Sequence, residues 1–357
     1  MMLPKQQRNK MMPIKDIIIR ALKRFFRLVT GKKFYPPECD CDRQSANDKI
    51  YNLLAQGKPC MIARYGTTEI NCVNNYLCVQ RDRNFWRKCL DYVTECTHTP
   101  WWNENHFHTM SVYSGIFPET QEIAEKFSKQ YLDDTPEIDI LASHQYYEKF
   151  MPLKPDVCRI QLEMLYPFFV ERPWTRILKG KKVLVVHPFE TTIRAQYTKR
   201  QCLFNNEDVL PEFELITLKA VQSLAGNNSQ YATWFDALHQ MEEQVSQLDF
   251  DVALIGCGAY GLPLAAYIKR LGKQAVHLGG GLQLFFGILG NRWVEQYPKI
   301  GVWHYRPGVD INLDYTSIFN DNWIYPLPED TLSNASIIEN ACYWRSEDES
   351  DKKVHTA

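Results

Sequence analysis

The chain has 357 residues and a formal net charge of −1, with 45% hydrophobic and 23% charged residues. This composition is typical of a soluble globular protein with one large domain or two of average size. The near-zero charge gives no global sign of nucleic-acid binding, and no apolar run approaches the ~18 residues of a membrane-spanning helix. No signal peptide is visible, and 11 irregularly spaced cysteines favour reduced thiols in a cytoplasmic protein over a disulfide framework.

The first 33 residues are strongly basic, with ten Lys or Arg against one acid, Asp16. Residues 13–30 fit an amphipathic helix, because bulky apolar side chains fall on one face and basic side chains on the other. Such a helix suits an anionic membrane surface and would hold the protein peripherally on the inner face of the cell membrane. Docking on the protein itself or on a partner is the alternative. Residues 34–45 are predicted to be a linker and residues 346–357 a disordered polar tail.

Strand and helix patterns alternate from residue 46 onwards. Apolar runs near residues 59, 138, 182, 213, 251 and 274 predict six strands. The order predicts a doubly wound, mainly parallel, Rossmann-like α/β sheet with helices on both faces over residues 46–300. Residues 301–345 are then expected to form a loop-rich extension.

Residues 99–108 are aromatic and polar without periodicity, which predicts a loop. Trp101, Trp102 and His106 could line a sugar pocket, since aromatic faces stack on pyranose C–H surfaces. Packing of these tryptophans in the core is the alternative.

Four predicted strands end in glycine or polar turns, at residues 64–69, 143–144, 187–192 and 256–261. Ligands of parallel sheets bind at the carboxyl ends of strands. We therefore expect one pocket built from these turns, beside the turn at 279–283. At one strand end His187 is a candidate base or phosphate contact, with a purely structural histidine as the alternative.

The segment 250–281 has the order strand, glycine turn, helix, strand, glycine turn. Its first turn has the G-x-G-x-x-G spacing, and glycines there let a phosphate approach backbone N–H groups. An NAD site usually has an acid at the end of the second strand, but residues 276–278 are Val, His and Leu. A nucleotide is therefore expected, and NAD is not favoured.

Two stretches together resemble one family. Residues 63–69, with the sequence Ala-Arg-Tyr-Gly-Thr-Thr-Glu, resemble the Arg-Phe-Gly-Asp-Gly-Glu motif that follows the first strand of GT-D-type glycosyltransferases. Residues 255–281 resemble the later glycine loop, helix and strand of that family, and the resemblance spans residues 49–290. It implies transfer of a sugar from a nucleotide-sugar, typically UDP-linked, to a saccharide, lipid-linked glycan or glycoprotein, as in bacterial surface polysaccharide or capsule synthesis.

The match to the motif is incomplete at its first acid. Arg64, Gly66 and Glu69 match, Tyr65 replaces Phe, and Thr67 stands where the family has Asp. The family's Asp-x-Glu pair is associated with a divalent metal at the donor diphosphate, where carboxylates hold a hard cation. Three possibilities therefore stay open: Glu69 holds Mn²⁺ or Mg²⁺ together with waters and the diphosphate, basic side chains such as Arg64 and Arg194 neutralise the diphosphate, or the activity is lost.

Arg64 and Glu69, by the resemblance, and His187, by its position at a strand end, are expected to be catalytic. Contacts with the nucleotide-sugar are expected from Tyr65, Gly66, Thr67, Thr68, Arg194, Gly256, Gly258, Tyr260, Gly261, Gly279, Gly280, Gly281 and Gln283. Two other functions remain open. One is a Rossmann-type transferase or oxidoreductase that uses a dinucleotide or S-adenosylmethionine; the other is a non-catalytic member of a glycan-assembly complex.

Overall fold

The structure is a computed structural model, which describes residues 14–95, 97–102, 104–226, 230–302 and 309–346. The chain divides into two compact units. The helical unit consists of residues 1–34 and 74–102, and the sheet unit consists of residues 35–73 and 103–357.

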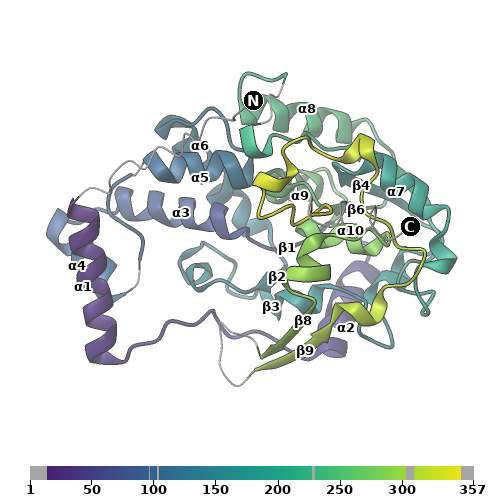
Figure 1. The fold of residues 1–357 in the computed structure, drawn as a ribbon, viewed down its shortest axis with the longest axis horizontal. Helices are drawn as coiled ribbons and strands as arrows, with labels where there is room; N and C mark the ends of the chain where they lie inside the picture. The colour runs from purple at the N-terminus through teal and green to yellow at the C-terminus, as the bar shows by residue number, and fades with distance from the viewer. Residues whose placement is uncertain (1–13, 96, 103, 227–229, 303–308, 347–357) are drawn as a thin grey trace, which may run out of the picture. The chain divides into compact units, whose positions relative to one another are not determined.

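The sheet unit contains seven parallel strands in the order β3-β2-β1-β7-β6-β4-β5 (Figure 1). The strands are β1 (Cys60–Ala63), β2 (Ile140–Ser143), β3 (Cys158–Gln161), β4 (Lys182–His187), β5 (Glu214–Lys219), β6 (Val252–Ile255) and β7 (Gln274–His277). The chain builds outward from β1 through β2 to β3, and later places β7 on the other side of β1. The predicted doubly wound parallel α/β sheet is therefore confirmed.

Both faces of the sheet are covered by helices, because successive strand residues point to opposite sides and both sets are apolar. On one face, Ile62 and Leu254 belong to a core that includes residues of α2, α7 and α10. On the other face, α9 contacts β1, β6 and β7, and α6 and α8 contact α9. These helices are α2 (Arg43–Ala55), α6 (Gln121–Asp134), α7 (Glu190–Tyr197), α8 (Trp234–Ser246), α9 (Gly261–Arg270) and α10 (Leu282–Phe285).

Two elements differ from the prediction. The strand β3 was not predicted, because it lies at the edge of the sheet and only Ile160 and Gln161 of its four residues are buried. The predicted loop at residues 99–108 is wrong from residue 104 onwards, where α5 (Glu104–Ser114) begins. Apolar and polar side chains are mixed around α5, so it lacks the apolar stripe by which a helix is recognised.

A two-stranded antiparallel sheet, β8 (Lys299–Val302) and β9 (Asp310–Asp314), follows the main sheet in the chain. Apart from Lys299 and Ile300, these strands lie in the segment 301–345 that was expected to be loop-rich.

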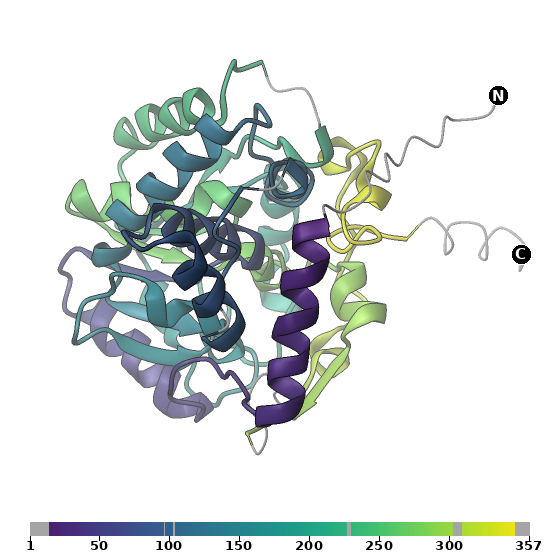
Figure 2. The same ribbon diagram turned by 90° about the vertical axis from the view of Figure 1, so that its left-hand side faces the viewer.

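The helical unit is built around α1 (Ile14–Thr30), which is seen along its full length in Figure 2, and α4 (Phe85–Thr94). Helix α3 (Thr67–Gln80) begins in the sheet unit and ends in the helical unit. The helix predicted over residues 13–30 is therefore present, and its fold partner is a segment that lies more than forty residues later in the chain. Within the described ranges, no helix is both long and apolar enough to cross a bilayer.

Candidate functional site

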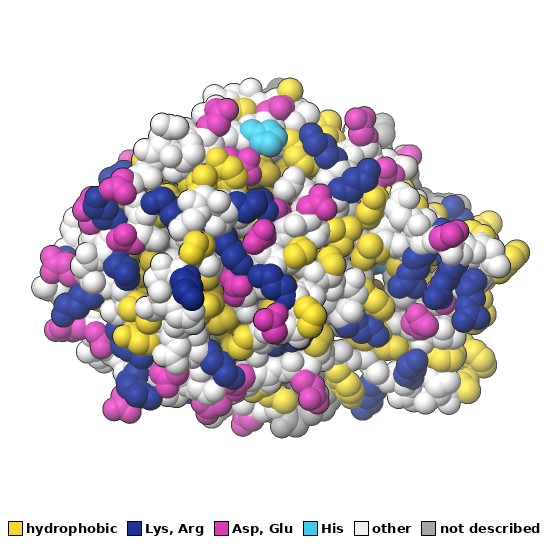
Figure 3. Space-filling view, turned by 180° about the vertical axis from the view of Figure 1, so that it is seen from behind, with side chains coloured by type: hydrophobic (Ala, Val, Ile, Leu, Met, Phe, Trp, Pro, Cys, Tyr) yellow, Lys and Arg dark blue, Asp and Glu magenta, His cyan; other side chains and the backbone are white. Residues whose placement is uncertain are grey.

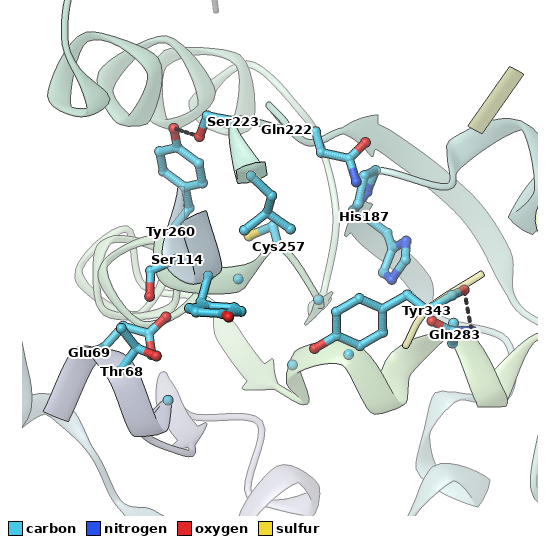
Figure 4. Close-up of a pocket in the computed structure, with 18 of the residues that line it drawn as sticks. Thr68, Glu69, Ser114, His187, Gln222, Ser223, Cys257, Tyr260, Gln283 and Tyr343 are labelled. Atoms are coloured by element: carbon cyan, nitrogen blue, oxygen red, sulfur yellow. Dashed lines mark hydrogen bonds between the residues drawn. The ribbon is translucent and has the colours of Figure 1, made fainter. Parts of the chain in front are cut away.

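A cavity of about 180 Å³ lies at the carboxyl ends of the central strands. The register of the sheet places β1 beside β7, β7 beside β6, and β6 beside β4. The turns that follow these four strands consequently meet at one edge, as expected for a ligand site in a parallel sheet. Residues of all four turns line the cavity (Figure 4).

Most of the residues expected to form the site line this cavity. They are Arg64, Gly66, Thr67, Thr68, Glu69, His187, Gly256, Gly258, Tyr260, Gly279, Gly280 and Gln283. The turn at 143–144 does not line it, and neither do Trp101, Trp102 and His106. Instead, Gln145 just beyond that turn donates its side-chain amide to the Thr67 hydroxyl at 2.7 Å.

Two predicted contacts with the nucleotide-sugar are not supported. Tyr65 is fully buried away from the cavity lining, and its hydroxyl shares a 2.9 Å hydrogen bond with Thr135. Just after the end of β1, the side chain of Tyr65 enters the core while that of its neighbour Arg64 lines the cavity. Arg194 is exposed on α7 and pairs with Glu190 one helical turn earlier, at 3.1 Å. Both residues therefore stabilise the fold locally and do not line the site.

Two predicted glycines also serve packing and do not line the cavity. A Cβ atom at Gly261 would overlap the ring of His277, and one at Gly281 would overlap the ring of Tyr166. The third glycine of the G-x-G-x-x-G pattern thus allows α9 to pack closely on the end of β7, a role that such glycines have in nucleotide-binding sheets.

Two other glycines that line the cavity have a local reason to be glycine, one through a close neighbour and one through its backbone conformation. A Cβ atom at Gly66 would overlap the carboxylate of Glu69. Gly279 has a φ of +63°, which favours glycine, and the Cδ atom of Arg64 lies 3.4 Å from where its Cβ would stand. Glu69 thus depends on the glycine at position 66 for its place in the cavity, whereas Gly279 is favoured by its own backbone conformation and is in ordinary contact with Arg64.

The charge of Arg64 is not paired by any described residue. Among the described residues, its guanidinium makes no hydrogen bond and no ion pair, although the group carries five N–H donors. The carboxylate nearest in the motif is Glu69, which is buried, and burial raises its pKa while the charge of Arg64 partly opposes that shift. A cationic group with unused donors in a cavity is suited to bind an anion.

His187 is placed as a hydrogen-bond donor and does not fit the predicted role of a base. Its Nδ1 atom accepts the backbone N–H of Phe189 at 3.0 Å, which assigns the ring proton to Nε2. Burial lowers the pKa of His187 to about 3, so the ring is neutral at neutral pH. Neither ring nitrogen then has a free lone pair for a proton, whereas Nε2–H can donate to a ligand oxygen. In Figure 4, His187 and Glu69 approach the cavity from opposite sides.

The C-terminal segment contributes residues that the sequence did not predict. Glu339, Tyr343 and Trp344 line the cavity, together with Arg292. The guanidinium of Arg292 pairs with Glu339 and lies 5.0 Å from the centre of the Tyr343 ring. These positions show no spacing pattern in the sequence. Hydrogen bonds between two backbone segments that are distant in the chain bring them together at the site. The amide N–H of Arg292 donates to the Cys342 carbonyl at 2.9 Å.

The residues that line the cavity do not fit a tightly held divalent cation. In the described ranges, no group of three or more His, Cys, Asp or Glu side chains is placed to hold a metal. The Thr67 hydroxyl already accepts a hydrogen bond from Gln145, and burial of Glu69 favours its neutral form. A site for Mg²⁺ or Mn²⁺ needs several oxygen ligands, with carboxylates among them. Thr67 and Glu69 therefore do not by themselves supply the ligand set that a divalent cation at this position needs.

No protein-family model matches the sequence, and no curated protein matches it significantly. Among solved structures, the chain is similar to a selenomethionine-substituted structure of domain of unknown function 1792, at 12% identity and a TM-score of 0.34, over 81% of this chain and 94% of that chain. It is similar at 11% identity and a TM-score of 0.34 to a structure described as a new glycosyltransferase of that domain from Streptococcus sanguinis, over 79% and 94% of the two chains. A third structure, similar at 10% identity and a TM-score of 0.32 over 81% and 96%, is described as having a distinct glycosyltransferase fold.

Proposed function

We propose that this protein is a glycosyltransferase, which moves a sugar from a nucleotide-sugar donor, of the UDP-linked class, to a saccharide, lipid-linked glycan or glycoprotein acceptor in surface polysaccharide synthesis. The observation that carries the proposal is the position of Arg64. Its guanidinium has no partner among the described residues, and it lies against the glycine turn after β7 in a cavity at the carboxyl ends of the strands. This is where a parallel sheet binds the phosphates of a nucleotide.

The donor diphosphate would be held by three kinds of group. Arg64 would neutralise its charge, and His187 would donate a hydrogen bond from Nε2. The first N–H groups of α3, at Thr67 and Thr68, have no partner within the helix because the first such bond is from Ile70 to the Gly66 carbonyl at 3.0 Å. The N-terminus of a helix favours an anion through these groups and its dipole.

In the proposed reaction, the bond from the anomeric carbon to the diphosphate oxygen breaks as a bond from the acceptor oxygen forms, and the proton of the acceptor hydroxyl passes to solvent water. Negative charge develops on the departing nucleoside diphosphate. Arg64 and His187 would stabilise that charge, because fixed donors in a cavity act where charge develops in the transition state. Glu69, on the opposite side of the cavity, would orient hydroxyl groups of the donor sugar (Figure 4).

In this chain, the guanidinium of Arg64 would supply the positive charge that a metal supplies in the GT-D family. The structure contains no second carboxylate beside Glu69 in α3, since Thr67 occupies that position and is engaged by Gln145. Arginine can neutralise part of the diphosphate charge because its guanidinium is charged at all relevant pH values.

A calorimetric screen of the full chain tests this proposal. UDP, GDP and dTDP and their common sugar conjugates are titrated in buffer with EDTA and again with Mn²⁺, and NAD and S-adenosylmethionine serve as competing classes. The proposal predicts binding of a nucleotide-sugar in both buffers. Binding of NAD or S-adenosylmethionine alone would favour a different Rossmann-type enzyme, and binding of none would overturn the proposal.

A lipid-linked acceptor would place the reaction at a membrane. We include peripheral attachment to the inner face of the cell membrane in the proposal. The helical unit would make this attachment through the exposed face of α1.

A further inference from the structure

Helix α1 packs in its own unit by its polar face. The carboxylate of Asp16 is buried and accepts the indole N–H of Trp101 at 2.6 Å. Lys23 donates to the Thr97 carbonyl at 3.3 Å, and its ammonium lies 4.0 Å from the centre of the Tyr92 ring. The positions that face the unit are therefore polar or mixed, whereas a helix docked on a protein core ordinarily buries its apolar stripe.

The apolar stripe of α1 is consequently exposed. Seven large apolar side chains of this helix are each more than half exposed: Ile14, Ile17, Ile18, Leu22, Phe25, Leu28 and Val29. Only Asp16 and Ile19 are buried in the described part of α1. Exposure of so many neighbouring apolar side chains marks an interaction surface.

Helix α4 adds further exposed apolar side chains to the same unit. Phe85 is 52% exposed and Trp86 is 80% exposed. Their position relative to α1 follows from ring contacts: Trp86 meets Phe85 edge-on at 5.6 Å, and Phe85 stacks on Trp101 at 6.0 Å. Since Trp101 also binds Asp16, the aromatic start of α4 lies beside the first turns of α1.

A basic groove accompanies this apolar face. It is lined by Arg20, Lys23, Arg24, Arg27, Lys32 and Lys33, with Leu28, Gly31 and Tyr92. No acidic side chain lines it. At the right-hand edge of Figure 3, Lys and Arg side chains gather beside hydrophobic ones.

We infer that this surface of the helical unit, made by the exposed apolar side chains of α1 and α4 and the basic groove, binds an anionic phospholipid bilayer. The apolar side chains would enter the boundary between headgroups and acyl chains, and the groove would bind lipid phosphates. Charge complementarity favours an anionic bilayer over a second copy of this chain. A second copy that used the same surface would bring its own six cations against the six in the groove. The aromatic pair on α4 is also the kind of residue enriched at membrane interfaces. This inference does not depend on the proposed transferase activity.

Vesicle co-sedimentation of the full chain tests the inference. Vesicles of phosphatidylcholine alone are compared with vesicles that also contain phosphatidylglycerol. The wild-type protein is expected to pellet with the anionic vesicles only, and high salt is expected to release it because salt screens the basic groove.

Two variants separate the apolar and basic contributions. The first, Arg20→Gln with Arg24→Gln and Arg27→Gln, is expected to weaken binding by on the order of a hundredfold, since each basic residue near an anionic surface contributes about a fivefold factor. The second, Ile18→Ser with Phe25→Ser, removes apolar groups that are already in water and is expected to abolish pelleting without loss of folding.

The matched control carries the same loss of charge elsewhere. Lys129→Gln with Lys179→Gln and Lys199→Gln changes three exposed lysines of the sheet unit and is expected to pellet as the wild type does. Equal loss in this control, or unchanged pelleting of both α1 variants, would overturn the inference. So would a dimer in analytical ultracentrifugation that Phe25→Ser dissociates while vesicles bind nothing, because the surface would then be an interface between copies.

Discussion

The side-chain amide of Gln145 donates to the hydroxyl of Thr67 at 2.7 Å. Thr67 occupies the position of the first acid in the motif that this chain resembles, and Gln145 comes from the turn after β2. A neutral donor therefore faces the position where a metal-binding carboxylate would stand. Such a donor would oppose a cation there.

We predict that binding of the nucleotide-sugar does not require a divalent cation. Affinity for the donor in EDTA is expected to lie within about twofold of that in Mn²⁺ or Mg²⁺, because Arg64 supplies the positive charge. Isothermal titration calorimetry measures both. A donor that binds only when Mn²⁺ is present would show that Glu69 recruits a metal together with the diphosphate.

Gly66→Ala is predicted to impair the site through Glu69. The added Cβ would overlap the carboxylate of Glu69 and force it from its place in the cavity. We expect a loss of about 1–3 kcal/mol in the free energy of unfolding, as for other overpacked positions, and a weaker affinity for the donor. The matched control is Gly301→Ala in β8, where a Cβ would meet no atom within 4 Å. Equal stability and affinity in both variants would contradict this account of Gly66.

Two buried histidines are predicted to make stability depend on pH. Burial lowers the pKa of His187 and of His277 to about 3, against about 6.5 in the unfolded chain. Between these values the unfolded state binds more protons, so stability falls as pH falls from about 6.5 towards 3. Each histidine contributes a slope of about 1.4 kcal/mol per pH unit in that window.

The contribution of one histidine can be isolated by difference. Urea unfolding of the wild type and of His187→Gln is compared at pH 7, 6 and 5, and the difference between their stabilities is expected to shrink as the pH falls. Other groups, such as Asp134, whose pKa burial raises to about 6, titrate in both proteins and cancel. A constant difference would mean that His187 is not held neutral in the folded state.

The backbone of residues 339–341 is predicted to tolerate glycine and reject a β-branched residue. Glu339, Asn340 and Ala341 have φ values of +46°, +55° and +54°, three consecutive residues in the left-handed region. Asn340→Val is expected to lower the free energy of unfolding by about 1–2 kcal/mol, whereas Asn340→Gly should preserve or slightly raise it. Circular dichroism during urea unfolding measures both variants.

This segment also forms part of the cavity wall. Since Glu339 pairs with Arg292 there, the loss in Asn340→Val should extend to donor affinity. If Asn340→Val matched Asn340→Gly in stability and affinity, the left-handed turn would not be important for the site.

The sequence predicts the sheet and one side of the site well. Buried parallel strands are continuous apolar runs, so β1, β4 and β6 are visible in the sequence, and Arg64, Glu69 and Gly256 line the cavity because turns after neighbouring parallel strands must meet. The edge strand β3 was not predicted because its first two residues are only half-buried and its four residues do not form an apolar run.

The other side of the site could not be predicted, because it is assembled by contacts distant in the sequence. Tyr343 and Arg292 reach the cavity through hydrogen bonds between their backbone segments, which leave no local pattern. The expectations for Tyr65 and Arg194 rested on residue type and on closeness to a motif or strand end. In the structure, Tyr65 is buried in the core just after β1, and Arg194 pairs with Glu190 on the surface of α7.

Arg64 carries the proposal, so the most direct test is a donor titration of Arg64→Gln beside Arg194→Gln in the presence of EDTA. Both changes remove one guanidinium, but only Arg64 lines the cavity. Loss of a charge-assisted contact with the diphosphate is expected to weaken binding by about tenfold to a hundredfold in Arg64→Gln, with Arg194→Gln unchanged. An affinity in Arg64→Gln equal to that of the wild type would contradict the account of this cavity as a diphosphate site.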